Sequence, residues 1–138
     1  MKRYEQFPHT SDIGVHVYGK DMHQLFENAA FAMFDVIADL ENISGDKAET
    51  IELEAGDQDM LLVSWLDELL FRFYTKGLIF YKFQIELLTE YKLKAKALAR
   101  PVAKNRNRLK TEIKAVTYSG LKIRKSEAGY EVEIIFDV

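Results

Sequence analysis

The segment DQDMLLVSWLDELLFRFYTKGLIFYKFQIELL, residues 57–88, changes its hydrophobic period at Gly77. Before the glycine, apolar residues recur every three or four positions, which is typical of an amphipathic helix, and Asp57 can cap its start. After the glycine, apolar and polar residues alternate, which is typical of a strand with one buried face. Gly77 itself fits the left-handed residue that ends many helices. A helix followed at once by a strand predicts a fold in which helices pack on a sheet.

The same two periods continue in both directions from this segment. A further helix is expected from Asp21, its cap, to near Asp39. The other apolar segments alternate as strands, at 3–7, 13–18, 50–55, 79–87, 93–97, 112–118 and 129–138, with 121–125 as another candidate. Pro8 is expected to break the first two strands apart. We therefore predict one α+β domain over residues 1–138, a two-layer sandwich with two helices on one face of a largely antiparallel, mixed sheet.

The composition excludes several classes of chemistry. The chain has no cysteine, which rules out disulfides, thiol catalysis and thiolate zinc sites and favours an intracellular location. The first residues lack the apolar core of a secretory signal, and no apolar run reaches the roughly 18 residues of a membrane span. The expectation is a soluble, cytoplasmic protein with no membrane partner.

Charge is distributed unevenly along the chain, although the formal net charge is only −3. Residues 91–125 hold twelve of the 19 Lys and Arg and a single acid, Glu112, so this segment carries +11 and the rest of the chain −14. Such a polarised molecule can orient an anionic partner on one side and a cation on the other. The alternative is that the lysines form the solvated face of edge strands, where charge prevents aggregation.

No catalytic set stands out in the sequence. Glycine-rich phosphate loops, nucleophile elbows and metal-binding histidine pairs are missing. His9, Ser11 and Asp12 are the residue types of a hydrolase triad, but neighbours on one extended segment cannot converge on a substrate. The polar run favours instead a turn that starts a strand. The residues alone therefore provide no candidate catalytic group.

Hard-cation binding is the better-supported chemistry. Asp137 and the α-carboxylate of Val138 lie one residue apart at the end of the sequence. If the last strand lies beside Asp12, three carboxylates meet, and such a cluster repels itself unless a cation fills it. The alternative is that these acids are simply solvated, as terminal acids usually are.

The basic segment RPVAKNRNRLK, residues 100–110, has no periodicity and is expected to be an exposed loop. Lys104, Arg106 and Arg108 are its candidates for contact with RNA or a protein partner. Aromatic side chains that could stack on bases are missing from it. A solvated loop without a partner is the alternative.

Four motifs together resemble the archease family. They are HTSDIG (9–14), LLVSWLDELLFRF (61–73), EIKAVTYSGLKI (112–123) and FDV (136–138), and they occur in the family's order in a chain of the family's length. The resemblance extends from His9 to Val138. It implies a two-layer α+β sandwich, in agreement with the order of elements above.

The resemblance implies a non-catalytic role as a protein cofactor of the RtcB-type RNA ligase, which joins RNA ends in tRNA splicing. Archeases promote guanylylation of the ligase's active-site histidine, allow multiple turnover and broaden its use of nucleotides. Older descriptions of the family as chaperones are not excluded. An RNA-binding chaperone working through the basic loop and a metal-dependent hydrolase remain the alternatives, and the oligomeric state is left open.

The resemblance also implies a divalent-metal site, with calcium or another divalent cation held by Asp12, Asp137 and Val138. Its Val138 ligand is a backbone or terminal carboxylate oxygen. His9 is expected to be a structural partner of this site, and Lys114 is a candidate functional residue beside it. Several members carry a histidine after the TY pair, whereas this chain has Ser119, so we assign no metal or proton-transfer role to that position.

Overall fold

The computed structural model describes residues 2–138 and contains two helices and eight strands within them. In chain order they are β1 (Tyr4–His9), β2 (Asp12–Gly19), α1 (Met22–Ile37), β3 (Lys47–Glu54), α2 (Gln58–Lys76), β4 (Leu78–Leu88), β5 (Lys92–Pro101), β6 (Ala115–Thr117), β7 (Arg124–Ser126) and β8 (Gly129–Asp137). Two single-turn 3-10 helices, Val102–Lys104 and Arg106–Arg108, lie between β5 and β6. None of the helices described in residues 2–138 is long and apolar enough to cross a membrane.

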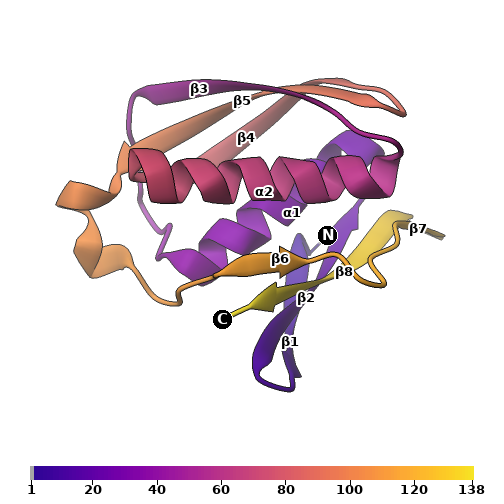
Figure 1. Ribbon diagram of the computed structural model, residues 1–138, viewed down its shortest axis with the longest axis horizontal. Coiled ribbons are helices and arrows are strands. Elements are labelled where there is room, and N and C mark those ends of the chain that lie inside the picture. Colours follow the sequence, from indigo (N-terminus) through magenta and orange to yellow (C-terminus); the bar gives the residue numbers. More distant parts are fainter. Residues whose placement is uncertain (1) are drawn as a thin grey trace.

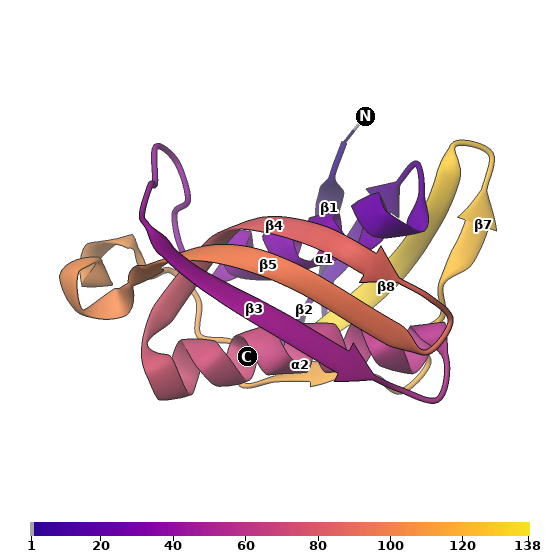
Figure 2. The ribbon, with the colours of Figure 1, turned by 90° about the horizontal axis from the view of Figure 1, so that it is seen from above.

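The strands form two antiparallel sheets, one in the order β1-β2-β8-β6, with β7 also paired to β8, and one in the order β3-β5-β4. Both helices lie between the sheets (Figures 1 and 2). The expected α+β class with two helices and antiparallel strands is confirmed. The strands divide between two sheets rather than one because α1 buries more than a single face. Ten of its 16 residues are buried, so it needs a sheet on each side.

The helix ends follow the predicted capping chemistry. The Asp21 carboxylate accepts from the backbone N–H of Gln24, and the Gln24 side chain accepts from the N–H of Lys20. Asp57 caps α2 in the same way through Met60, and Gly77 ends it with φ 63°. Local sequence therefore determines where both helices begin and where α2 ends.

Several details differ from the expectation. β6 covers only Ala115–Thr117 of the predicted 112–118, and β7 covers Arg124–Ser126 rather than 121–125. β1 continues through Pro8 to His9 instead of breaking there. Because β1 is an edge strand, proline can be accommodated on the side that has no neighbouring strand, where no backbone N–H has to donate a hydrogen bond. The basic segment is not wholly irregular, since it contains the two 3-10 turns and Leu109 forms a bridge to Ala38. Such turns cannot be recognised from hydrophobic periodicity, because each spans only three residues.

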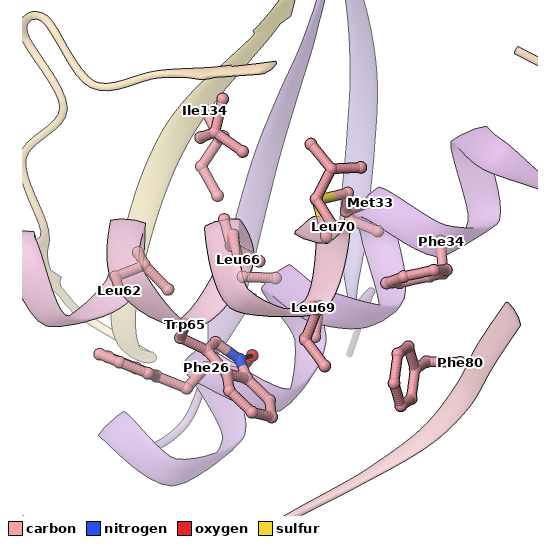
Figure 3. Packing of buried hydrophobic residues seen from close by; sticks show 14 of the residues in the cluster. Phe26, Met33, Phe34, Leu62, Trp65, Leu66, Leu69, Leu70, Phe80 and Ile134 are labelled. Atoms are coloured by element: carbon pink, nitrogen blue, oxygen red, sulfur yellow. Dashed lines mark hydrogen bonds between the residues drawn. The ribbon is translucent and has the colours of Figure 1, made fainter. Parts of the chain in front are cut away.

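The core is centred on Trp65 of α2, which is fully buried (Figure 3). Its indole N–H donates to the backbone oxygen of Phe26 at 2.9 Å and so ties α2 to α1. The ring meets Phe83 of β4 edge-on at 6.2 Å between centroids. Phe34 of α1 packs edge-on against Phe80 at 5.5 Å. These contacts join both helices to the three-stranded sheet.

An ion-pair group connects α2 to the outer strand β3. Glu49 accepts from Lys76 at 2.7 Å and from Arg72 at 3.1 Å, and Arg72 also donates to Glu68 at 2.6 Å. The hydrogen bond from Lys76 holds the pKa of Glu49 below its ordinary value, and the charges of Lys76 and Arg72 act in the same direction. The carboxylate therefore stabilises the fold in its ionised form.

We predict that Trp65→Phe lowers the free energy of unfolding by about 2–3 kcal/mol, because it leaves a void and removes the hydrogen bond to Phe26. Urea unfolding followed by circular dichroism measures the change. Phe71→Leu is the control: this aromatic residue of the same helix is 60% exposed, and its replacement should change stability by less than about 0.5 kcal/mol. Equal effects of the two variants would contradict the central role of Trp65.

We further predict that Glu49→Gln lowers the free energy of unfolding at neutral pH by about 1 kcal/mol. Because the folded-state pKa is lowered, this stabilisation is complete above the ordinary carboxyl pKa of 4.5 and is lost as the pH falls through the folded value. Unfolding curves from pH 7 to about pH 3 should therefore converge at the acid end. Glu54→Gln, whose exposed pair with Lys92 spans 3.6 Å, serves as the control and should have little effect at any pH.

Candidate functional site

The HTSD segment forms a tight turn between β1 and β2. His9 ends β1, Asp12 begins β2, and the two are register partners, so Thr10 and Ser11 alone make the turn. Ser11 has φ 60°, in the left-handed region that turns often require. The expected turn is therefore present, and it places His9 and Asp12 side by side at its base.

The β2–β8 register brings the two aspartates together, since Asp12 lies directly opposite Asp137. Directly opposite residues on antiparallel strands project from the same face, with Cβ atoms about 4.5–5.5 Å apart. His9 Nδ1 lies 3.5 Å from Asp12 Oδ2, and the Asp12 side chain is only 26% exposed. Residues 125 positions apart in the sequence thus form one cluster.

The third strand of the cluster is β6, beside the other edge of β8. Ala115 is the register partner of Asp137, and the backbone N–H of Lys114 donates to the Asp137 carbonyl at 2.7 Å. Val138 follows directly and packs, partly buried, against the core. Figure 1 shows this end of β8 next to β6 and β2. We call Asp12, Asp137 and Val138 the acidic tip, with His9 and Lys114 as its neighbours.

The donor atoms of the acidic tip suit a hard cation. Two aspartates lie opposite each other on paired strands, and calcium accepts carboxylate and backbone oxygens together with water. Among residues 2–138 no group of three or more His, Cys, Asp or Glu side chains is arranged to hold a metal ion. The further protein ligand that the resemblance implies is an oxygen of Val138, the residue after Asp137. The residues fit a calcium ion on these terms.

The basic loop divides into structural and exposed cations. Arg108 donates to the carbonyls of Asp39 at 3.0 Å and Glu41 at 2.9 Å, so its guanidinium anchors the loop after α1. Lys104 and Arg106 are exposed. Of the three residues predicted to contact RNA or a partner, Arg108 thus has a structural role in the fold, and none of them lies in the acidic tip.

The lysines of β5 face acids on the neighbouring strands. Lys92 lies 3.6 Å from Glu54, and Lys94 lies 3.8 Å from Glu52. Lys96 lies 3.9 Å from Glu86 on the other side. Part of the charge asymmetry along the sequence is therefore neutralised across the sheet, which favours the solvated-face interpretation for these three lysines.

One surface feature escaped prediction from the sequence. A groove lies between the end of α2 and residues 101–112, with Tyr74 and Leu109 among its apolar lining. The available signal was weak: Tyr74 is one aromatic residue near the end of a helix, and Leu109 is a lone apolar residue in a basic segment. Only the fold brings them together.

Comparison with known proteins identifies relatives over the full length. The family described as "Archease protein family (MTH1598/TM1083)" matches residues 4–138. "Protein archease" of Methanosarcina mazei is 40% identical over 99% of this chain and 97% of its own length. "Protein archease" of Pyrococcus abyssi is 39% identical over 94% of this chain and 93% of its own.

Two solved structures share the fold. The solution structure of Methanobacterium thermoautotrophicum protein 1598 superimposes with a TM-score of 0.88 at 33% identity and covers 100% of both chains. A crystal structure from Thermotoga maritima, described as an archease and possible chaperone, gives a TM-score of 0.68. It is 18% identical and covers 97% of this chain and 96% of its own, so it supports the fold alone.

We predict that Asp12→Asn raises the free energy of unfolding in the presence of a chelator, by a few tenths of a kcal/mol up to about 1 kcal/mol. Like charges directly opposite each other on adjacent strands destabilise a sheet, and the substitution removes one of them. Chemical unfolding in EDTA measures the change. Glu90→Gln, in the turn between β4 and β5, is the matched control and should leave stability unaltered; a loss of stability in Asp12→Asn would show that the two carboxylates do not repel.

Proposed function

The chain belongs to the archease family, as its motifs predicted, and from this premise we propose that it is a non-catalytic protein cofactor of the RtcB-type RNA ligase of tRNA splicing. In this role it acts in the cytoplasm, promotes guanylylation of the ligase's active-site histidine, allows multiple turnover and broadens nucleotide use. The observation that carries the proposal is the pairing of Asp12 with Asp137, which gathers carboxylates on an exposed end of the sheet.

The proposal includes a divalent cation, with calcium as the best match to the oxygen donors. Asp12 and Asp137 would hold it through their carboxylates and Val138 through a backbone oxygen. When bound, the ion would supply positive charge that stabilises phosphate oxygens. His9, 3.5 Å from Asp12, restrains the orientation of that carboxylate from the facing strand. The N–H of Lys114 restrains the backbone of Asp137 in the same manner.

The mechanism that we propose is positional. The tip enters the ligase's active-site cleft, and its carboxylates help to arrange metal, nucleotide and histidine for nucleotidyl transfer. Correct placement of reacting groups can supply a large part of a rate enhancement without a nucleophile from the cofactor protein. The hairpin turn and the β2–β8 ladder suit this role because they keep the carboxylates on a rigid strand end rather than on a loose loop.

RNA binding through the basic loop is the second candidate, and the exposure of Lys104 and Arg106 is the observation in its favour. The carbonyl contacts of Arg108 weigh against it, since they leave one fewer guanidinium for phosphate. Contact with phosphates would show as a steep loss of affinity with salt. The ligase-cofactor role should be retained when Lys104 and Arg106 are neutralised.

We predict that Asp12→Ala and Asp137→Ala leave the fold intact and reduce multiple-turnover RNA ligation by the partner ligase to the level of the ligase alone. The reason is that each removes one of the two carboxylates of the tip. Turnover and ligase guanylylation are measured with and without the protein, and calorimetric titration with calcium chloride measures cation binding separately. Glu90→Ala, in the turn between β4 and β5 of the three-stranded sheet, is the control and should stimulate normally. Normal stimulation by Asp12→Ala would refute the assignment of the tip.

A further inference from the structure

The groove between α2 and the basic loop lies apart from the acidic tip and has a volume of ≈ 580 Å³. Its apolar lining comes from the end of α1, the last turns of α2 and the loop: Ile37, Phe73, Tyr74, Val102 and Leu109. Tyr74 is 49% exposed and Leu109 37% exposed, so both side chains are open to solvent in the groove that they line. Figure 1 shows the loop standing beside this end of α2. The groove thus offers apolar surface to an outside chain.

The walls of the groove are held by hydrogen bonds. Asn105 is buried, accepts from Arg100 Nε at 3.1 Å and donates to the Pro101 carbonyl at 2.7 Å, which organises the two 3-10 turns. The N–H of Lys110 donates to the Ile37 carbonyl at 2.8 Å and fastens the loop to α1. A groove that is already formed loses little conformational entropy when it is filled.

The rim of the groove is predominantly cationic. Arg106 and Lys110 line it from the loop and Lys76 from α2, while Glu112 is its one acid. Lys76 is engaged with Glu49, so Arg106 and Lys110 are the cations that face a ligand. Arg100 and Arg108, by contrast, bond to backbone oxygens of residues 39–44. The groove therefore presents an apolar floor with positive charge on one rim.

We propose that this groove binds an acidic segment of a protein partner, one that inserts an apolar side chain between Tyr74 and Leu109 and sets carboxylates against Arg106 and Lys110. Apolar floors flanked by charge are typical of peptide grooves. A nucleic acid fits less well, because a run of phosphates draws its affinity from many cations, whereas this groove offers an apolar lining with Arg106 and Lys110 as its available charges. Resting on the proposed function, the inference assigns this segment to the RtcB-type ligase.

The groove and the acidic tip are joined by one stretch of chain. Tyr74 donates its hydroxyl to the Ile113 carbonyl at 2.6 Å, and the next residue, Lys114, bonds to Asp137 at the tip. A partner bound at the tip therefore lies close to the groove. The two surfaces carry opposite charge, so together they favour one orientation of the partner and disfavour the reverse.

The test is the affinity of the purified ligase for the protein. A fluorescent label is attached to a cysteine introduced by Glu90→Cys, and it reacts at that position alone because the sequence contains no cysteine. Fluorescence anisotropy is expected to show that Arg106→Glu/Lys110→Glu weakens binding roughly tenfold or more at 0.1 M salt. Tyr74→Ser should also weaken binding without a change in charge, and amides of residues 101–112 should gain hydrogen-exchange protection when the ligase binds.

The control is Lys20→Glu/Lys82→Glu, which alters net charge equally at exposed positions, Lys20 lying at the opposite end of α1 from Ile37. Circular dichroism and thermal unfolding verify that each variant folds. If the wild-type protein stimulates the ligase and the groove variant binds as tightly as the control, the inference is overturned while the proposed function stands. The inference would also be overturned if the groove variant lost only RNA affinity, or only self-association, and still bound the ligase normally. Failure of the wild-type protein to bind or stimulate the ligase would refute both.

Discussion

The pairing of β2 with β8 is the constraint on which the rest of the structure depends. It aligns residues 12–19 with residues 130–137 and so joins the two ends of the sequence in the middle of one sheet. Val15, Val17, Ile134 and Phe136 are buried on its inner face, beneath α1. A slip of one residue would turn these side chains to solvent, so burial strongly specifies the register. That register, set by the core, is also what holds Asp12 opposite Asp137.

Two neighbouring surfaces of opposite charge result from this arrangement. The acidic tip lies at the end of the β2–β8 ladder, and the groove lies beyond the β6 segment that borders it. Total charge is a poor guide to either surface, because the lysines of β5 face acids across the sheet and Arg108 anchors the loop. A partner meets the remaining exposed cations, of which Arg106 and Lys110 line the groove. The exposed charge is therefore a product of the fold.

Much of the secondary structure could be predicted because its causes are local. Asp21 and Asp57 cap the helices through residues three positions away, and Gly77 ends α2 by its own backbone freedom. The division into two sheets could not be predicted in this way, since it depends on which strands pair across long distances. For the site, the resemblance to archeases, not spacing, joined Asp12 to the FDV end, and nothing in the sequence pointed to the groove at Tyr74.

The sequence by itself determined the helices, most of the strands, the HTSD turn and the family, because periodicity, capping and motifs depend on residues that are close together in the sequence. The tertiary structure alone decided that both helices lie between two sheets, that Asp12 faces Asp137, and that Tyr74 and Leu109 share a groove. It also decided which arginines are structural. The physical reason is that these contacts join residues far apart in the chain, and only the burial of a common core selects one set of them.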